Sequence, residues 1–408
     1  MADPLQRYLQ RYPTHAGKTF EKPPKPIAPS TMVVIIPCHD EPTLTTTLES
    51  LAQCDPPPNP IEVVVVVNDC ANDPESIRQQ NQHTLQSLLQ YPLRWPLHTI
   101  NATAQADREG GVGAARKRGM DATIVRMASY GVDDGILISL DADCLVNPHY
   151  LCAIGESFRH HPDAPAITTN FAHRIEDAPS IHARAAIINY ELHLRLYWEG
   201  LKQAGVPYAF PTIGSCFACR ASSYAKQGGM NRRQAGEDFY FLHKLAQLGT
   251  LVHCTGASVF PSPRLSSRTP FGTGQAMRNW MQQGTEHWPS YHPQSFADLA
   301  IFIHNIQYLW QDPTIAHLPD SIQAFLRQQH GEEKINNIRH HTTTATAFHK
   351  RCLHWFNGFL AMKFIRFACN TFYGWLPVEN SVAAMLKYDQ NPSDPEMLLL
   401  FLRRLQSQ

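Results

Sequence analysis

The sequence has no excess of either charge and no long uninterrupted apolar run. Lys plus Arg number 35, and Asp plus Glu also number 35. Since no overall positive field attracts polyanions, nucleic acid is not an expected partner. The most apolar long stretch, 356–378, contains Lys363, Arg366, Asn370 and Pro377, which is too much polarity for a membrane-spanning helix. We therefore expect a buried helix there.

The first residues also lack the pattern of a secretory signal. They contain neither a basic start followed by an apolar run nor a small-residue cleavage site, so we expect a cytoplasmic protein. In that compartment the ten cysteines should be reduced and should pack as small apolar residues. Cys216 and Cys219 are closely spaced, but no second pair completes a zinc site, so packing is the favoured role for them too.

What the sequence does contain is a series of short, β-branched apolar runs. Such runs are typical of parallel strands buried on both faces. Helical patterns separate them, and a Gly-rich turn at 110–113 opens another helix. This alternation predicts an α/β fold with a mostly parallel, doubly wound sheet. The predicted strands are 32–36, 61–67, 136–140 and 166–170, and the predicted helices are 44–53, 76–90, a helix ending at 128, 180–203 and 237–248.

The composition changes along the chain predict three parts. Residues 1–30 are polar and proline-rich, which indicates an extended N-terminal arm with one short helix at 5–12. The α/β domain should cover 31–283, and a helical C-terminal region should cover 284–408. Its aromatic face around Trp355 is interpreted first as core, with an acceptor pocket, a subunit contact or peripheral membrane contact as alternatives. The helices predicted there are 295–310, 321–329, 346–372 and 395–405.

Acidic residues follow three of the predicted strands. The carboxyl ends of parallel strands are where open α/β sheets bind ligands. Carboxylates gathered there repel one another unless they bind a cation or a polar ligand. Mg²⁺ and Mn²⁺ take oxygen ligands and share them with substrate phosphates, so the pattern predicts a metal-diphosphate site. The residues are Pro37, Asp40 and Glu41 after the first strand, Asn68 and Asp69 after the second, and Asp141 and Asp143 after the third.

Taken in order over residues 31–260, these motifs resemble the inverting glycosyltransferases of family 2, which have the GT-A fold and use nucleotide-activated sugars. The family's Pro-x-x-Asn-Glu corresponds to Pro37-Cys-His-Asp40-Glu41, and its Asp-Asp-Gly-Ser turn corresponds to Asn68-Asp69-Cys-Ala. The helix with Ala-Arg-Asn corresponds to Ala115-Arg116-Lys117, the Asp-x-Asp to Asp141-Ala-Asp143, and the later Glu-Asp pair to Glu237-Asp238.

The resemblance implies a role for each matching position. Glu41 and Asp69 would lie in the pocket for the base and ribose, together with Pro37, Asp40 and Asn68. Arg116 would be a polar clamp near the nucleotide. Asp143 would hold Mn²⁺ or Mg²⁺, Asp141 would lie near the ribose or the metal, and residues 214–220 would form the floor beneath the sugar and acceptor.

The chemistry of sugar transfer suggests further candidates. A metal neutralises the leaving diphosphate, and a carboxylate deprotonates the acceptor hydroxyl. Asp238, beside Glu237, is the predicted base, the alternative being a helix cap that complements the dipole. Arg264 and Arg268 are predicted to bind the diphosphate from a Gly-rich lid, or else to be solvated on a surface loop. His253 is a candidate third metal ligand, although a lone histidine is more often structural.

The sequence thus predicts a metal-dependent glycosyltransferase of the hexosyltransferase type, inverting, with a nucleotide-sugar donor. Its acceptor is a saccharide, a lipid-linked molecule or a small molecule. A retaining transferase, a sugar nucleotidyltransferase and a non-catalytic nucleotide-sugar-binding module stay open as alternatives. A dinucleotide-dependent oxidoreductase fits poorly because Gly111-Val-Gly113 lacks the third glycine, Arg116 follows it, and the preceding 101–109 is too polar for a buried strand.

Overall fold

The computed structural model describes residues 3–12, 20, 25–105, 111–231, 236–265, 272–284, 287–387 and 394–407. Its internal contacts divide the chain into two units. Unit 1 comprises 1–183, 211–278 and the last two residues, and unit 2 comprises 184–210 and 279–406. The sequence predicts one boundary, at 283–284, whereas these contacts group 184–210 with the C-terminal helices.

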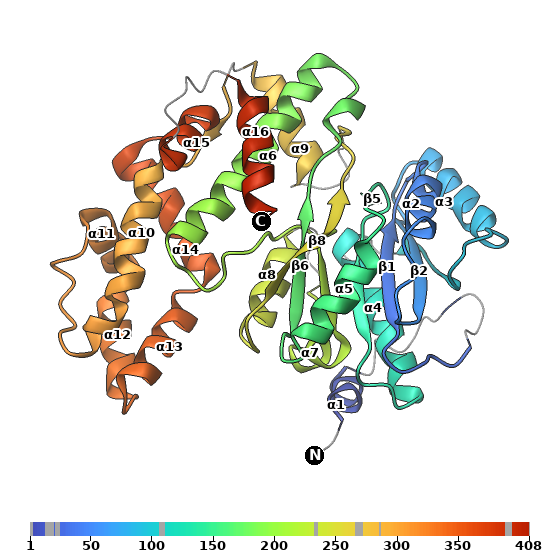
Figure 1. Cartoon of the computed structure of the whole chain (residues 1–408), viewed down its shortest axis with the longest axis horizontal. Coiled ribbons are helices and arrows are strands. Elements are labelled where there is room, and N and C mark those ends of the chain that lie inside the picture. Colours follow the sequence, from blue (N-terminus) through green and yellow to red (C-terminus); the bar gives the residue numbers. More distant parts are fainter. Residues whose placement is uncertain are drawn as a thin grey trace. The chain divides into compact units, whose positions relative to one another are not determined.

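Unit 1 is built on an eight-stranded sheet with the order β3-β2-β1-β4-β7-β6-β8-β5 (Figure 1). β3, β2, β1 and β4 are parallel neighbours, and β6 is parallel to β8. Only β7 and β5 run antiparallel to their neighbours, so the prediction of a mostly parallel α/β sheet is confirmed. The strands are β1 Met32–Cys38, β2 Ile61–Cys70, β3 Leu97–Gln105, β4 Ile136–Ser139, β5 Leu145–Val146, β6 Ala166–Phe171, β7 Phe217–Arg220 and β8 Val252–Phe260.

The central strands are buried along almost their whole length because helices cover both faces of the sheet, which is why their sequences are mostly apolar. Met32 is level with both Ile61 and Ile136, so β1, β2 and β4 are in register and deliver their following residues to one edge. The helices of unit 1 are α1 Pro4–Arg11, α2 Leu44–Ala52, α3 Glu75–Leu88, α4 Val112–Ser129, α5 Tyr150–His160, α7 Ala221–Lys226 and α8 Glu237–Leu245, with a short 3-10 turn η3 at Ile175–Asp177.

One strand of the sheet was not expected. Residues 97–105 form β3, so the described part of the polar segment 101–109 belongs to a strand that the sequence did not predict. β3 is an edge strand that pairs only with β2, and edge strands tolerate polar, solvent-facing side chains. Ile100 and Ala102 point inward and are buried, whereas Asn101 is exposed.

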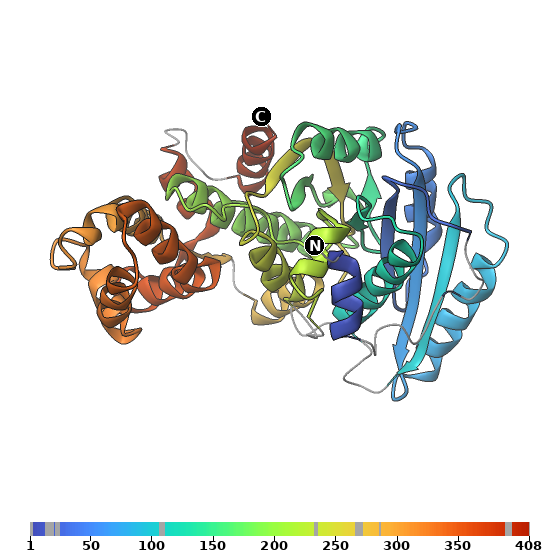
Figure 2. The ribbon, with the colours of Figure 1, turned by 90° about the horizontal axis from the view of Figure 1, so that it is seen from below.

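Unit 2 is helical, as predicted for the C-terminal region, and its helices α10–α14 pack together as a bundle (Figure 2). The predicted single helix 346–372 is wrong. It breaks at Asn357, whose side chain accepts hydrogen bonds from the backbone N–H of Phe359 and Leu360 and so caps a new helix. The elements are α10 Pro293–Asn305, η4 Ile306–Trp310, α11 Asp320–Gln328, α12 Gly331–His340, α13 Ala345–Trp355, α14 Gly358–Ala368, the π-helical turn η5 Cys369–Tyr373, α15 Val378–Leu386, α16 Pro395–Gln406, and the strand pair β9 Pro289–Ser290 and β10 Leu376–Pro377.

Two helices cross from one unit to the other in sequence, α6 (Ile181–Gln203) and α9 (Thr273–Gln283). Ion pairs explain why most of α6 groups with unit 2. Arg184 forms two hydrogen bonds with Glu396 of α16, at 2.5 and 2.8 Å. The fully buried Glu191 accepts hydrogen bonds at 2.8 and 2.7 Å from Arg403 of α16.

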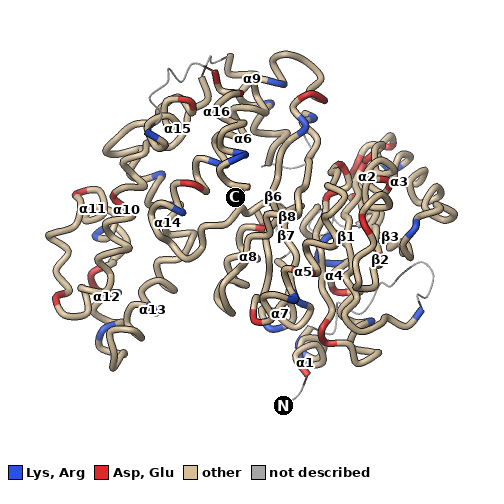
Figure 3. The backbone as a smooth tube through the Cα atoms, viewed as in Figure 1, with Lys and Arg blue, Asp and Glu red and all other residues tan. Residues whose placement is uncertain are grey.

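Charges of both signs are interspersed along the tube of unit 1, in line with the zero net charge (Figure 3). Across the described ranges, none of the helices combines the length and apolar character needed to cross a membrane.

Candidate active site

The candidate site lies at the carboxyl edge of the unit 1 sheet. β1, β2 and β4 are parallel and end there. β7 is antiparallel to both β4 and β6, so β6 runs in the same direction as β4, and β8 is parallel to β6. β8 therefore ends at the same edge. This edge therefore carries the acidic residues after β1, β2 and β4, and also the segment with Arg264 that follows β8. The register of the sheet thus gathers most of the predicted site residues.

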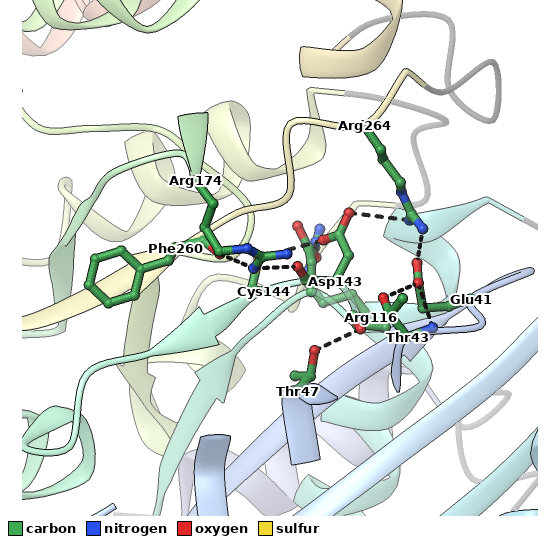
Figure 4. A network of polar contacts seen from close by, with 11 residues as sticks. Glu41, Thr43, Thr47, Arg116, Asp143, Cys144, Arg174, Phe260 and Arg264 are labelled. Atoms are coloured by element: carbon green, nitrogen blue, oxygen red, sulfur yellow. Dashed lines mark hydrogen bonds and ion pairs between the residues drawn. The ribbon is translucent and has the colours of Figure 1, made fainter. Parts of the chain in front are cut away.

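The Asp141-Ala142-Asp143 turn is held by side chains from neighbouring elements. Thr47 of α2 donates a hydrogen bond to the Ala142 carbonyl at 2.8 Å. Arg174, which follows β6, donates to the Asp143 carbonyl at 3.2 Å and to the Phe260 carbonyl at 2.7 Å (Figure 4). Because the carbonyls of Ala142 and Asp143 are both held by hydrogen bonds, the backbone of the turn fixes the direction of the Asp143 carboxylate. Neither Thr47 nor Arg174 was predicted from the sequence to support the site.

Arg116 connects the Asp-x-Asp turn with the start of α8. Its Nη2 donates to Asp141 Oδ1 at 2.6 Å, and its Nη1 forms an ion pair with Glu237 Oε1. The side chains of Arg116 and Glu237 are only 2% and 4% exposed. A Cβ on Gly214 would lie 2.8 Å from Arg116 Nη2, so the absence of a side chain at Gly214 makes room for the guanidinium. Asp238, the next residue of α8, is thereby brought to the same site.

Arg264 forms a second cationic bridge. Its Nη1 forms an ion pair with Glu41 Oε2, and its Nη2 lies 3.2 Å from Asp143 Oδ2 (Figure 4). The other oxygen of Glu41 accepts from the backbone N–H of Thr43 at 3.0 Å and from its hydroxyl at 2.6 Å. Glu41 and Asp143, which follow different strands, are thus joined by one guanidinium.

A third polar group surrounds Asp69, which is buried. Asp69 Oδ2 accepts from Asn81 Nδ2 at 3.0 Å, and Asp69 Oδ1 accepts from the Ala104 backbone N–H at 2.6 Å. Asn81 of α3 also donates to the Asn68 carbonyl and accepts from the backbone N–H of Asp40, whose φ of 49° is left-handed. This buried asparagine, which the sequence did not identify, fixes the ends of β1 and β2 relative to each other.

Burial and neighbouring charges shift the pKa of two of these acids. Burial raises the pKa of Asp143, an effect that Arg264 opposes and that the negative charges of Asp141 and Glu41 reinforce. Burial, followed by the charge of Glu237, raises the pKa of Asp238 to about 7, while Arg116 opposes the rise. Asp238 Oδ1 also accepts from the Phe239 backbone N–H at 2.7 Å. An acid with a pKa near neutrality is well suited to accept a proton.

The donor set suits a hard divalent cation. Asp141 and Asp143 supply carboxylate oxygens at a strand end, and Mg²⁺ is commonly held by one or two carboxylates together with substrate phosphates. Among the described residues, no group of three or more His, Cys, Asp or Glu is placed to hold a metal by itself.

Two predicted residues are not part of this cluster. His253 lies at the opposite end of β8 from Phe260, and its ring nitrogens face the Thr168 hydroxyl at 3.1 Å and Asn170 Oδ1 at 2.9 Å. The structure therefore does not bring His253 to Asp143. Arg268 lies outside the described residues.

Comparison with known families gives one match. Residues 33–228 match the family described as Glycosyl transferase family 2, which confirms, for this part of the chain, the resemblance that the motifs indicate. The match includes the ends of β1, β2 and β4 and also Arg116, while Glu237 and Asp238 lie beyond it. The family match supports a glycosyltransferase, and the sheet described above agrees with the predicted GT-A class. Among curated proteins, none matches the chain.

Similar solved structures include the mannosyltransferase PcManGT from Pyrobaculum calidifontis in complex with GDP-Man and Mn²⁺, at 15% identity and a TM-score of 0.37, covering 99% of this chain and 94% of that one. Another is S. aureus TarS 1-349 in complex with UDP-GlcNAc, at 14% identity and a TM-score of 0.38, covering 80% and 91%. The chain spans 43% of the length of a longer TarS structure, with a TM-score of 0.32 and 14% identity over 67% of this chain. At TM-scores below 0.5, none of them identifies a substrate of this chain.

Proposed function

We propose that the chain transfers a sugar from a nucleotide-diphosphate donor to an acceptor hydroxyl, with inversion and with the help of Mn²⁺ or Mg²⁺. The observation that carries this proposal is the bridge made by Arg116. It joins Asp141 of the Asp-x-Asp turn to Glu237 of α8, so that a metal-binding turn and the candidate base Asp238 share one site. The family match over residues 33–228 supports the same chemistry.

The donor nucleotide is assigned to the ends of β1 and β2. Pro37, Asp40 and Glu41 border this region from β1, and Asn68 and Asp69 border it from β2. Each carboxylate oxygen has more than one lone pair, so Asp69 keeps the capacity to accept from a base or ribose while Asn81 and Ala104 hold it in place. Because both terminal nitrogens of Arg116 already donate to carboxylates, we assign Arg116 to positioning Asp141 and Glu237.

Asp143, with Asp141 beside it, would hold the cation. When bound, the cation supplies positive charge that stabilises the departing nucleotide diphosphate. Arg264, together with Arg268 four positions later in the sequence, is assigned to the phosphate oxygens, because a guanidinium forms paired hydrogen bonds with them.

Asp238 is assigned as the general base. In an inverting displacement, the acceptor oxygen forms a bond to the sugar C1 as the bond from C1 to the diphosphate oxygen breaks, and the hydroxyl proton passes to Asp238. A pKa of about 7 lets the carboxylate be ionised near neutral pH and still take a proton effectively. Glu237 is assigned the supporting role of holding Arg116.

The test is a donor screen with purified full-length protein. Thermal midpoints are measured with UDP-, GDP-, ADP- and TDP-sugars, each with Mn²⁺, Mg²⁺ or EDTA, and also with NAD(P), because a ligand of the folded state raises apparent stability. The proposal predicts stabilisation by one nucleotide class that EDTA removes. Stabilisation by NAD(P) alone, or by none of these molecules, contradicts it.

Variants then separate the roles. Asp143→Asn should remove the metal-dependent stabilisation, whereas Asp238→Asn should keep donor binding and lose transfer, a loss of about 10²-fold or more. Asp133→Asn, which changes an exposed aspartate in the loop before β4, is the matched control. Equal loss of donor affinity in the Asp143 and Asp238 variants contradicts the assignment. The anomeric configuration of the product, measured by NMR, decides between inversion and retention.

A further inference from the structure

We propose that Arg264 is an internal cation that occupies the Glu41–Asp143 site before the donor binds, so that a divalent metal binds well only together with a nucleotide diphosphate. This inference rests on the proposed function and concerns the regulation of the same site. Arg264 therefore acts as a positioning residue that sets the order in which ligands bind.

The geometry of the two acids supports this role. The Glu41 side chain is 1% exposed, and its Oε1 is already satisfied by Thr43, so its Oε2 is the oxygen that faces Arg264. Asp143 faces the same guanidinium at 3.2 Å. A buried carboxylate without a positive partner is costly, so Arg264 stabilises this pair of acids.

The same contact opposes a metal ion. Asp143, the principal proposed metal ligand, is paired with Arg264, and its neighbour Asp141 is paired with Arg116. A divalent ion that approaches Asp143 meets the positive charge of Arg264 and must displace one of its ion pairs. Binding of the metal alone is therefore weakened by the cost of breaking the contact between Arg264 and Asp143.

A nucleotide diphosphate changes this balance. Its oxygens offer Arg264 a new anionic partner, with which a guanidinium forms two parallel hydrogen bonds. Once Arg264 turns to the diphosphate, Asp143 is left for the metal, which also gains phosphate oxygens as ligands. Metal and nucleotide then raise each other's affinity, and by linkage the two effects are equal in size.

The experiment measures Mn²⁺ binding to the full chain by electron paramagnetic resonance, first without nucleotide and then with UDP or GDP. In the wild type we expect weak binding without nucleotide and at least tenfold tighter binding with one of the two nucleotides. In Arg264→Gln we expect Mn²⁺ alone to bind about 10- to 100-fold more tightly than in the wild type, which corresponds to the loss of one charged hydrogen-bonded contact. The nucleotide should then add less affinity for Mn²⁺ than it adds in the wild type, because only the gain from its phosphate oxygens remains.

Two more variants separate the effect of the guanidinium geometry from that of its charge. Arg264→Lys retains the charge but not the fork that spans both acids, so its affinity for Mn²⁺ alone should lie between those of the wild type and Arg264→Gln. Arg159→Gln removes an exposed arginine at the end of α5 and is the control for a change of one positive charge. Circular dichroism and thermal midpoints show whether each variant is folded.

The outcomes distinguish this proposal from the proposed function. If Mn²⁺ binds to the wild type with nucleotide and Asp143→Asn abolishes that binding, but Arg264→Gln binds Mn²⁺ alone no more tightly than the wild type, only the Arg264 proposal is overturned. If sugar transfer proceeds unchanged in EDTA and no variant binds Mn²⁺, the metal site itself is refuted.

Discussion

Arg116 offers the sharpest test of how this site is held together. Replacing it with methionine keeps much of the side-chain volume and removes the charge, leaving Glu237 buried without its cation and Asp141 without its 2.6 Å hydrogen bond. The pKa of Arg116 itself is raised, because the carboxylates of Asp141 and Glu237 outweigh the opposing effect of burial. Both side chains of the Arg116–Glu237 pair are buried, so water screens the attraction between their charges only weakly.

Removing one partner of such a pair destabilises a protein by about 3–5 kcal/mol, because the remaining charge loses its solvation and its partner. The surface pair of Arg78 with Glu75, whose side chains are 43% and 64% exposed, provides the matched control. Arg78→Met should lower the free energy of unfolding far less than Arg116→Met does, because water screens an exposed pair. The free energy of unfolding is measured from guanidinium titrations followed by circular dichroism.

A double-mutant cycle completes this test. The double variant Arg116→Met/Glu237→Gln should lose less free energy of unfolding than the two single variants lose in sum. The difference, the coupling energy, should be about 1–3 kcal/mol. If Arg116→Met is no more damaging than Arg78→Met, or if the two changes at 116 and 237 are additive, the bridge does not organise the site as we describe.

Three further predictions follow from individual residues. Burial raises the pKa of Asp238 to about 7. Between roughly pH 4 and 7 the folded chain therefore binds more protons than the unfolded chain, and the free energy of unfolding falls as pH rises. Asp238→Asn removes this ionisable group, so it should raise the thermal midpoint at pH 8 but not at pH 4. Gly214→Ala places a Cβ 2.8 Å from Arg116 Nη2. It should lower the rate of sugar transfer by about tenfold or more, while donor binding, measured by calorimetry, changes little. An unchanged rate would show that a shift of Arg116 does not affect catalysis. Asn357→Ala removes the cap of α14 and should cost about 1 kcal/mol in guanidinium titrations, whereas Asn357→Asp should cost less; equal losses would argue against the cap.

The sheet was predictable wherever a strand is buried on both faces. Runs such as Met32–Cys38 and the five valines at 63–67 are apolar at every position because helices cover both sides. β3 was missed because an edge strand alternates between buried and exposed side chains and pairs on one side only. The break between α13 and α14 was missed because Asn357 stands within a sequence that is apolar on both sides, where only the cap itself marks the end of a helix.

For the site, the residues at strand ends could be located because each apolar run and the polar turn that closes it are local features of the sequence, and parallel strands bring such ends to one edge. The hydrogen-bond and ion-pair partners of these residues could not be located from the sequence. Arg116 contacts Glu237, which lies 121 positions later, and Asn81 of α3 contacts Asp69, which lies 12 positions earlier. His253 was a candidate metal ligand because it lies at a strand end, but the direction of β8 places it at the other edge of the sheet. Which end of a strand faces the site depends on topology, which a single segment does not encode.

Helix α6 also determines how the chain can be shortened. Residues 184–210 lie between β6 and β7 in the sequence, yet they group with helices that come after residue 278. Ending the chain at 283 would keep the fully buried Glu191 while removing Arg403, and it would also deprive Arg195 of Gln406, its hydrogen-bond partner at 2.8 Å. Such a fragment should aggregate or be degraded rather than act as a minimal enzyme. A viable shorter version would have to lose 184–210 and 279–406 together, with a new connection joining the two halves of the sheet.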